Sequence, residues 1–527
     1  MRKFLVIFLL SCIYTAAWAN TAESAWHFRA MKDEMNRTLK ELYLPGNLRP
    51  YYVAYWLEEN YRFVASASLG DVYTHTDRTS PNLYVNSVLK VGNNQNNNTG
   101  YYNYDRAWEY VAERGAPASY EGIRQALWEN SNRLYLDAIE QYKEKEAYRR
   151  RKNIKNPLPD VVPAAQATYV EEIPAWQQPD RERLDQWVRK VSAWGNEVPF
   201  FENFEVEIQK RQQNYYYLNS RGGKGQWPSI VYECRVDVEF SQPDGYKESW
   251  NRLIMLRDFS EQELERAEAE VKKFIGDMQG IYGAPEAEVY LGPVLYDPAG
   301  ASEFLDLLLG KLRNMAPWWN NESDEDDTAS LLRKKIGMRV LSPGINIYDR
   351  PKARTFRGFE LVNFSPIDKE GVASEELTLV SGEKLQQVPL SQRPLNDKKH
   401  KSNGHAFKGI GRERLSSVFV EPENPLTKEQ LKAKLMERCK ELELPYCYIA
   451  RGDSFRRVYT DDGHEEWVVG LYESNWTSRS LRDILAAGSD FELGDYNVIT
   501  PSILVDEIEL MSEDRRPERK PFIDKPQ

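Results

Sequence analysis

The segment with the clearest chemical interest is EVYLGPVLYDPAGASEFLDLLLGKL, at residues 288–312. It predicts a short strand, a Gly-Pro turn and a buried helix with Asp297 as N-cap and Pro298 in the first turn. A zinc peptidase needs two neutral imidazoles on one helix, with a carboxylate that takes the proton from the metal-bound water. The chain has five histidines and none between His75 and His400, so this helix cannot carry such a site.

The other histidines also make poor metal ligands. His400 and His405 flank the residues KSNG, and Gly404 makes this spacing typical of a loop rather than of a helical ligand pair. His464 stands alone in DDGHEE, which predicts a hairpin turn. We interpret these residues as structural or solvent-facing, with a metal site as the less favoured alternative. The sequence also lacks the G-x-S-x-G elbow of a serine hydrolase.

Four residues form a candidate peptide-binding set: Glu303, His405, Arg412 and Arg414. The two arginines follow His405 closely, and a guanidinium group binds a peptide carboxylate through two parallel hydrogen bonds. Surface ion pairing is the alternative explanation for both arginines. Glu303 lies on the predicted helix with Asp306, although acidic pairs are common in a chain with 81 Asp and Glu residues. No catalytic or metal-binding residue is assigned.

The first half of the chain is predicted to mix helices and strands. Helices are expected at 23–44, 120–152, 181–194 and 261–282, the last with Ser260 as N-cap. Strands are expected within 51–77 and 81–94, with turns at Glu59-Asn60 and Gly92-Asn93, and at 204–209 and 229–240. The tract NNQNNNTGYYNY predicts a polar loop or a sheet edge.

The second half is predicted to be rich in strands. Short strands are expected at 335–341, 345–348, 378–380, 417–420, 446–450, 455–459, 466–472 and 503–510, and helices at 427–441 and 478–487. Five prolines make 154–180 a linker or wrapping loop. We therefore expect an α+β protein of two domains: an N-terminal α/β domain at 20–285 that includes the linker, and a β-rich C-terminal domain at 286–527.

The first 19 residues predict a removed export signal. Arg2 and Lys3 precede an apolar stretch, and Ala17-Trp18-Ala19 is the small-x-small pattern that signal peptidase cleaves. The alternative is a lipoprotein cleavage box that leaves Cys12 acylated. No later run approaches the ~18 apolar residues of a membrane span. We expect a periplasmic or extracellular protein without an integral membrane span.

Three cysteines remain after processing: Cys234, Cys439 and Cys447. They are too few for a disulfide scaffold. Either Cys439 and Cys447 pair in an oxidising compartment, or all three are small buried apolar residues. The net charge of -11 disfavours a nucleic-acid partner, because binding to phosphates requires a basic surface.

Several stretches of the second half, taken in order, resemble the TldD/PmbA family, described as metallopeptidase-related and as modulator of DNA gyrase. They are EVYLGPVLYDPAGASEFLDLLLGKL, IGMRVLSPGINIYDRP, NFSPIDKEGVASEELTLVSGEKL, SNGHAFKGIGRERLSSVFVEP and DDGHEEWVVGLYES with ITPSILVDEIEL. The stretch ASASLGDVYTHTDRTSPNLYVNSVLKVGNN extends the match weakly into the first half. The resemblance implies a TldD/PmbA-like architecture.

The chain departs from the active members of that family. These carry a His-Glu-x-x-x-His helix after the Gly-Pro turn and a distant cysteine as third zinc ligand. With Glu303 on the motif glutamate, the histidine positions fall on Ser302 and Leu307, and neither side chain can bind zinc. No cysteine follows Cys447. Zinc is typical of active relatives and is not expected here.

The resemblance implies a function without catalysis. In the family, an active subunit pairs with a related subunit that lacks the motif, around an enclosed space that accepts peptides. We expect an envelope protein that forms a peptide cavity, alone or as a homo- or heterodimer with a TldD/PmbA-like subunit. Two alternatives stay open: a peptidase with an unconventional site that uses His405 with Glu303, and a structural envelope protein.

Overall fold

The computed structural model describes residues 26–512, except 78–79, 101–110, 156, 313–331, 333, 395–399, 408–411, 453, 475 and 495–496. The predicted export signal, with Cys12, lies outside the described residues.

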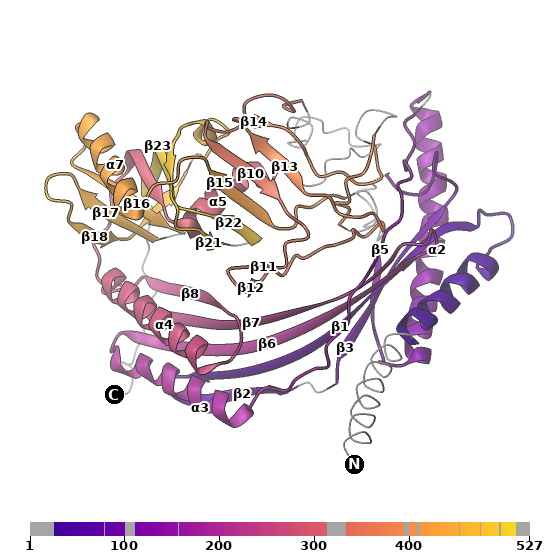
Figure 1. Cartoon of the computed structure of the whole chain (residues 1–527), viewed down its shortest axis with the longest axis horizontal. Coiled ribbons are helices and arrows are strands. Elements are labelled where there is room, and N and C mark those ends of the chain that lie inside the picture. Colours follow the sequence, from indigo (N-terminus) through magenta and orange to yellow (C-terminus); the bar gives the residue numbers. More distant parts are fainter. Residues whose placement is uncertain are drawn as a thin grey trace, which may run out of the picture.

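Eight strands form a long, curved sheet in the first half (Figure 1). Their order is β4-β3-β1-β6-β7-β5, with β2 paired to β1 and β8 to β7. The strands are β1 (Pro50–Ser68), β2 (Asp71–Asp77), β3 (Asn82–Val91), β4 (Ala112–Ala116), β5 (Thr168–Val170), β6 (Phe201–Asn219), β7 (Lys224–Ser241) and β8 (Lys247–Leu256).

The predicted turn at Glu59-Asn60 is wrong, because β1 continues through both residues. Antiparallel pairing with β6 runs from Ala54 to Ser68 without a register shift, so the ladder fixes the backbone there. Strand β3 pairs with the same two residues from the other side. The hydrogen bonds of these two continuous ladders outweigh the local preference of asparagine for a turn.

The described residues of this half form four α-helices: residues 26–41, α2 (Tyr120–Arg151), α3 (Arg181–Ser192) and α4 (Glu261–Ile281). They confirm the helices predicted there. The Ser260 side chain accepts a hydrogen bond from the backbone of Glu263, as expected for an N-cap. All four pack on one face of the sheet, which we call the convex face (Figure 1).

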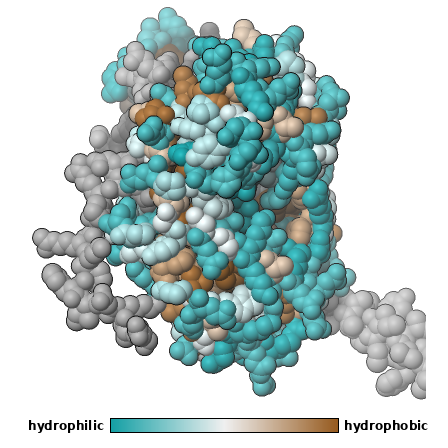
Figure 2. All heavy atoms as spheres, turned by 90° about the vertical axis from the view of Figure 1, so that its left-hand side faces the viewer, coloured by the Kyte–Doolittle hydropathy of each residue, from teal (hydrophilic) through white to brown (hydrophobic). Residues whose placement is uncertain are grey.

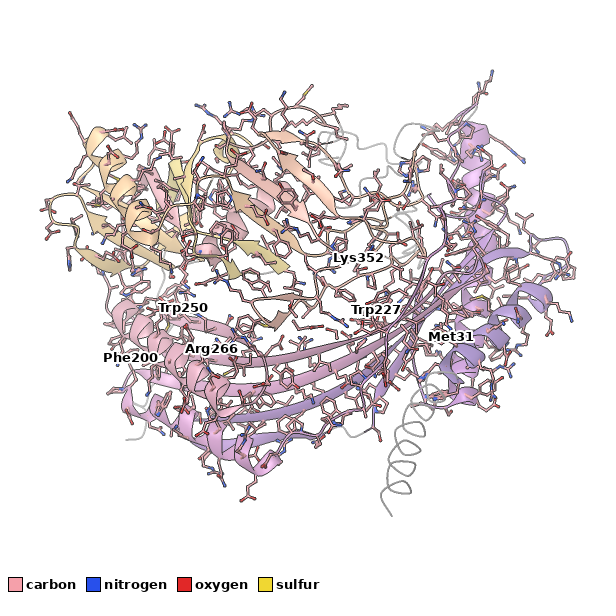
Figure 3. The ribbon with its side chains drawn as sticks, viewed as in Figure 1. Met31, Phe200, Trp227, Trp250, Arg266 and Lys352 are labelled. Carbon is pink, nitrogen blue, oxygen red and sulfur yellow. A yellow bond between two sulfur atoms is a disulfide. The ribbon has the colours of Figure 1, made fainter. Side chains whose placement is uncertain are left out.

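The alternation of side chains along β1 separates two buried faces. Val53, Tyr55 and Leu57 pack with the helix at 26–41 and α2, whereas Phe63, Ala65 and Ala67 pack with α3 and α4. The intervening side chains Tyr52, Ala54 and Trp56 face the opposite, concave side, where they pack with Trp227 and with Ile367 of the second half. Figure 3 shows Trp227 between the sheet and the second half, and Met31 on the far side of the strands.

Two further sheets make up the second half. One has the order β14-β13-β10-β15-β22-β21, and the other has the order β18-β17-β16-β9-β23-β19 with β20 on β23. The strands are β9 (Tyr290–Tyr296), β10 (Ile345–Asp349), β13 (Leu377–Ser381), β14 (Lys384–Leu385), β15 (Val418–Pro422), β16 (Tyr446–Arg451), β17 (Ser454–Tyr459), β18 (Glu465–Val468), β19 (Leu471–Glu473), β20 (Ile484–Ala487), β21 (Glu492–Leu493), β22 (Val498–Thr500) and β23 (Ile503–Ser512). The short β11 (Thr355–Phe356) and β12 (Phe359–Glu360) form a separate hairpin.

Helices α5 (Pro298–Leu309) and α7 (Lys428–Glu441) pack on these sheets, and both were predicted. The helix predicted at 478–487 is wrong: a 3-10 turn at Ser480–Arg482 leads into β20, whose backbone pairs with β23. The strand predicted at 335–341 is also wrong. Gly337 has a φ of +81°, and Met338 donates to the carbonyl of Lys335 in a turn.

The segment 157–180, which we call the wrapping segment, contacts the second half near residues 162–167 and continues onto the convex face at residues 173–177. Val162 donates its backbone N–H to Gln392, and Ala167 donates to Gly371. The three residues of β5 then add a parallel edge strand to β7.

A buried ionic cluster ties this wrapping segment to α2. Lys145 Nζ lies 2.6 Å from Asp160 Oδ2 and donates to the carbonyls of Asn97, at 3.0 Å, and Thr99, at 2.7 Å. Asp160 also accepts the backbone N–H of Asn97. Residues 93–100 of the asparagine-rich tract therefore form a loop, one of the two predicted alternatives, in which residues 97–100 are buried whereas Asn93 and Gln95 are exposed.

The side of the molecule that carries α7, α4 and α3 is mostly hydrophilic, and hydrophobic residues form small separate patches between the polar ones (Figure 2). Within the described ranges, no helix combines the length and the apolar character needed to cross a membrane.

Replacing Lys145 with Met should lower the free energy of unfolding by about 3 to 5 kcal/mol, because Asp160 would stay buried without its cation. Urea unfolding followed by circular dichroism measures this. Lys143→Met, at an exposed position of the same helix, should change stability by less than about 0.5 kcal/mol. Equal effects of the two substitutions would contradict the role given to the cluster.

Candidate functional site

Helix α5 begins as the sequence predicts. The Asp297 side chain accepts the backbone N–H groups of Ala299, at 3.1 Å, and Gly300, at 3.2 Å. Arg451 Nε lies 3.3 Å from the same carboxylate. Burial raises the pKa of Asp297, although the arginine and the N–H groups favour its ionised form. The carboxylate of Asp297 therefore caps the N-terminus of α5.

The side chains of α5 do not fit a zinc ion. Ser302 is buried and packs on Gly494, where an added Cβ would lie 2.7 Å from the Ser302 Cβ. Leu307 packs against the hydrophobic core, and Glu303 is exposed beside Gly452. A zinc site needs several nitrogen, sulfur or carboxylate donors that converge. In the part of the chain that the structure describes, no three His, Cys, Asp or Glu side chains converge in that way.

His405 is buried and fully occupied by hydrogen bonds. Its Nε2 lies 3.1 Å from Asp349 Oδ2, and its Nδ1 lies 2.9 Å from Asn403 Oδ1 and 3.0 Å from the Asn403 carbonyl. The Asp349 carboxylate also accepts the backbone N–H groups of Ser416 and Ser417. Both ring nitrogens lie within hydrogen-bond distance of protein oxygen atoms, so His405 holds two loops together.

The other two histidines of the second half have structural surroundings. His400 Nε2 lies 2.6 Å from the carbonyl oxygen of Ser391, and burial lowers its pKa. His464 lies in the turn between β17 and β18, as predicted, where its backbone N–H donates to Asp462.

One pocket brings two of the predicted peptide-binding residues together. It has a volume of about 130 Å³, and His405 and Arg414 both line it. We call it the central pocket. Its walls are Tyr215 and Trp227 of the sheet and residues 362–365, 368–369, 404–407 and 414–416 of the second half. Glu303 and Arg412 are not among its lining residues, although the carbonyl of Arg412 accepts the backbone N–H of Phe407 at its edge.

The central pocket combines aromatic walls with two cations. Tyr215 and Trp227 stand opposite each other on β6 and β7, with their rings stacked 5.5 Å apart. The Arg414 guanidinium lies over the ring of Phe407 at 4.9 Å. Lys369 Nζ lies 5.5 Å from the centre of the Tyr215 ring and 4.0 Å from Glu58 Oε1. Burial lowers the pKa of Lys369.

The floor of the pocket depends on Asp368. Its carboxylate accepts the backbone N–H groups of Glu370 and Val372, both at 2.9 Å, and of Ala406, at 3.0 Å. It thereby closes the turn that ends at Gly371, whose φ is +80°. Burial, and then the nearby Glu370 carboxylate, raise the pKa of Asp368 to about 7.

Sequence reasoning missed Lys369, Asp368 and both sheet aromatics. The stretch DKEG at 368–371 carries a turn signal, because an aspartate that bonds the following backbone often precedes a glycine with positive φ. No sequence signal indicates that this turn meets Tyr215 and Trp227, which lie more than a hundred residues away.

Stability should depend on the ionisation of Asp368. Because its pKa is higher in the folded chain than in the unfolded chain, the folded state holds the proton more tightly, and stability falls as pH rises from about 4 to about 7. Asp368→Asn removes this titration. The thermal midpoint of the natural chain, minus that of the variant, should therefore decrease over this range and level off above it. A difference that stays constant with pH would contradict the assignment.

Comparison with known proteins relates this fold to one family. Residues 291–441 match the family model of the PmbA/TldA metallopeptidase C-terminal domain. No curated protein matches the sequence.

Three crystal structures share the fold at low sequence identity. A protein of Thermotoga maritima described as a modulator of a DNA gyrase is 14% identical, with a TM-score of 0.58, over 87% of this chain and 96% of its own. TldE from Thermococcus kodakarensis is 13% identical, with a TM-score of 0.57, over 92% of this chain and 100% of its own. A Bacteroides thetaiotaomicron protein described as a modulator of DNA gyrase is 13% identical, with a TM-score of 0.59, over 92% of this chain and 98% of its own. Residues 291–441 therefore match a PmbA/TldA-type C-terminal domain, and the chain as a whole shares the α+β fold of these three structures.

Proposed function

We propose that this chain is a non-catalytic TldD/PmbA protein that holds the end of a peptide in the central pocket. The observation that carries the proposal is the donor set of α5. Where the family resemblance expects two zinc-binding imidazoles, the helix presents the hydroxyl of Ser302, buried against Gly494, and the alkyl side chain of Leu307. Neither group binds zinc or activates water.

The chemistry of the central pocket supports a peptide carboxylate as ligand. Arg414 and Lys369 supply positive charge, and a guanidinium group is well suited to bind a carboxylate through paired hydrogen bonds. The stacked rings of Tyr215 and Trp227 provide an apolar wall for a side chain. The volume of about 130 Å³ suits the end of a peptide rather than a folded partner.

A peptidase that uses His405 with Glu303 is disfavoured on geometry. A general base must have a ring nitrogen available for the proton that it abstracts. Asp349 and Asn403 occupy both nitrogens of His405, and Glu303 lies on the exposed side of α5 beside Gly452, outside the central pocket.

We place the protein in the cell envelope, as one subunit of a dimer with a TldD/PmbA-like chain or alone. Support comes from the export signal that the sequence predicts at residues 1–19 and from a disulfide between Cys439 on α7 and Cys447 on β16. Disulfides persist mainly in oxidising compartments. Cys234, the remaining cysteine of the described residues, is buried.

Peptide capture tests the central pocket. A random tetrapeptide mixture with free C-termini, and the same mixture amidated, are incubated with the protein and the bound fraction is measured by mass spectrometry. The free acids should bind at least about ten-fold more tightly, since a charge-assisted hydrogen bond contributes about 1.5 kcal/mol or more. Arg414→Gln should remove most of this preference.

Arg235→Gln is the matched control, because Arg235 lies on β7 in an exposed ion pair with Asp237, outside the central pocket. It should keep the preference of the natural chain. Equal capture of acids and amides, or no capture of either, would contradict the proposal, and the second result would favour a purely structural role.

A further inference from the structure

A second pocket lies on the convex face of the sheet, between two groups of helices: the helix at 26–41 with α2, and α3 with α4. Its volume is about 250 Å³, and it takes residues from the helix at 26–41, from β1 and β6, and from the wrapping segment. We call it the His27 pocket. Glu59 of β1 stands on its floor, whereas the neighbouring Glu58 faces the concave side and Lys369. The two pockets therefore lie on opposite faces of one sheet.

Aromatic rings form the walls of the His27 pocket. Tyr61 and Trp176 are stacked, with ring centres 5.5 Å apart. On the other side, the ring of His27 lies between Trp26, at 3.8 Å, and Tyr216, at 4.2 Å. Rings from four separate parts of the chain thus converge on one cavity, and the faces of the aromatic rings carry negative charge that attracts cations.

The polar groups of the pocket are incompletely satisfied. Asn214, directly opposite Glu59 in the sheet, donates to Glu59 Oε2 at 2.8 Å. Glu59 Oε1 has His27 Nε2 as its neighbour, at 3.6 Å, which is too long for a hydrogen bond. His27 is only 3% exposed, and neither of its ring nitrogens has a hydrogen-bond partner among the described residues.

The pocket also carries a buried negative charge. Glu59 is 7% exposed. Burial alone would raise its pKa, but the neighbouring His27 and Asn214 outweigh that effect and lower it. Lys210 lies on the same face of the sheet, but it does not line the pocket. Its ammonium group lies over the ring of Trp176 and donates to the carbonyl of Gln177. A cationic partner would further stabilise this ionised carboxylate, which is buried among rings.

We infer that the His27 pocket binds a small organic cation, an alkylammonium group. Its nitrogen would lie against the faces of Tyr61 and Tyr216 and beside Glu59 Oε1, which lies 3.6 Å from His27 Nε2. The rings contribute cation–π attraction and Glu59 contributes the counter-charge. This site does not depend on the function proposed for the central pocket.

Calorimetric titration of the full chain with choline and with butylammonium tests the inference. The control ligand is 3,3-dimethylbutan-1-ol, which has the shape of choline without its charge. At least one of the two cations should bind ten-fold or more tightly than the neutral alcohol. Equal binding of choline and the alcohol, or no binding of either cation at 20 mM, would overturn it.

Two variants test the residues. Glu59→Gln should weaken binding of the cation at least ten-fold, and Trp176→Leu, which removes a wall contributed by the wrapping segment, should also weaken it. Glu58→Gln, the adjacent residue on the other face, should not. Thermal unfolding confirms that each variant is folded. Binding that survives in Glu59→Gln, or is lost equally in Glu58→Gln, would overturn the assignment.

Discussion

The structure depends on one constraint, which is that the long sheet must be buried on both faces. Along β1, the side chains of Val53, Tyr55 and Leu57 need helices, and those of Tyr52, Ala54 and Trp56 need something else to cover them. Loops of the second half supply that cover, with Ile367 packed directly on the concave cluster. The sheet is thus the surface on which the two halves of the chain meet.

Both pockets follow from this arrangement. The central pocket forms where the turn at 368–371 meets Tyr215 and Trp227. The sheet is twisted, so the turn covers its surface incompletely there. The His27 pocket forms where the two groups of helices on the convex face fail to meet. There, the strands carry Glu59 and Asn214 instead of apolar residues. The polar character of these gaps makes them candidate binding sites rather than packing defects.

The predictable parts of the fold are those decided by local sequence. Helices α2, α4 and α7 have N-caps and periodic apolar residues, and the sequence places them well. The turn assigned to Glu59-Asn60 and the helix assigned to 478–487 failed because pairing with distant strands overrode local preference. The candidate site shows the same division. His405 and Arg414 are close in sequence and share a pocket, but Trp227, Tyr215 and Lys369 are joined only by the tertiary fold.

The proposed function rests on α5, whose side chains serve packing where the family resemblance expects two zinc-binding histidines. Buried Ser302 and the core contact of Leu307 make the helix part of the hydrophobic core of the second half. The most direct test is the zinc content of the purified full chain, measured by elemental analysis after saturation with zinc and exchange into zinc-free buffer. Much less than one zinc per chain is predicted. One tightly held zinc per chain would contradict the account.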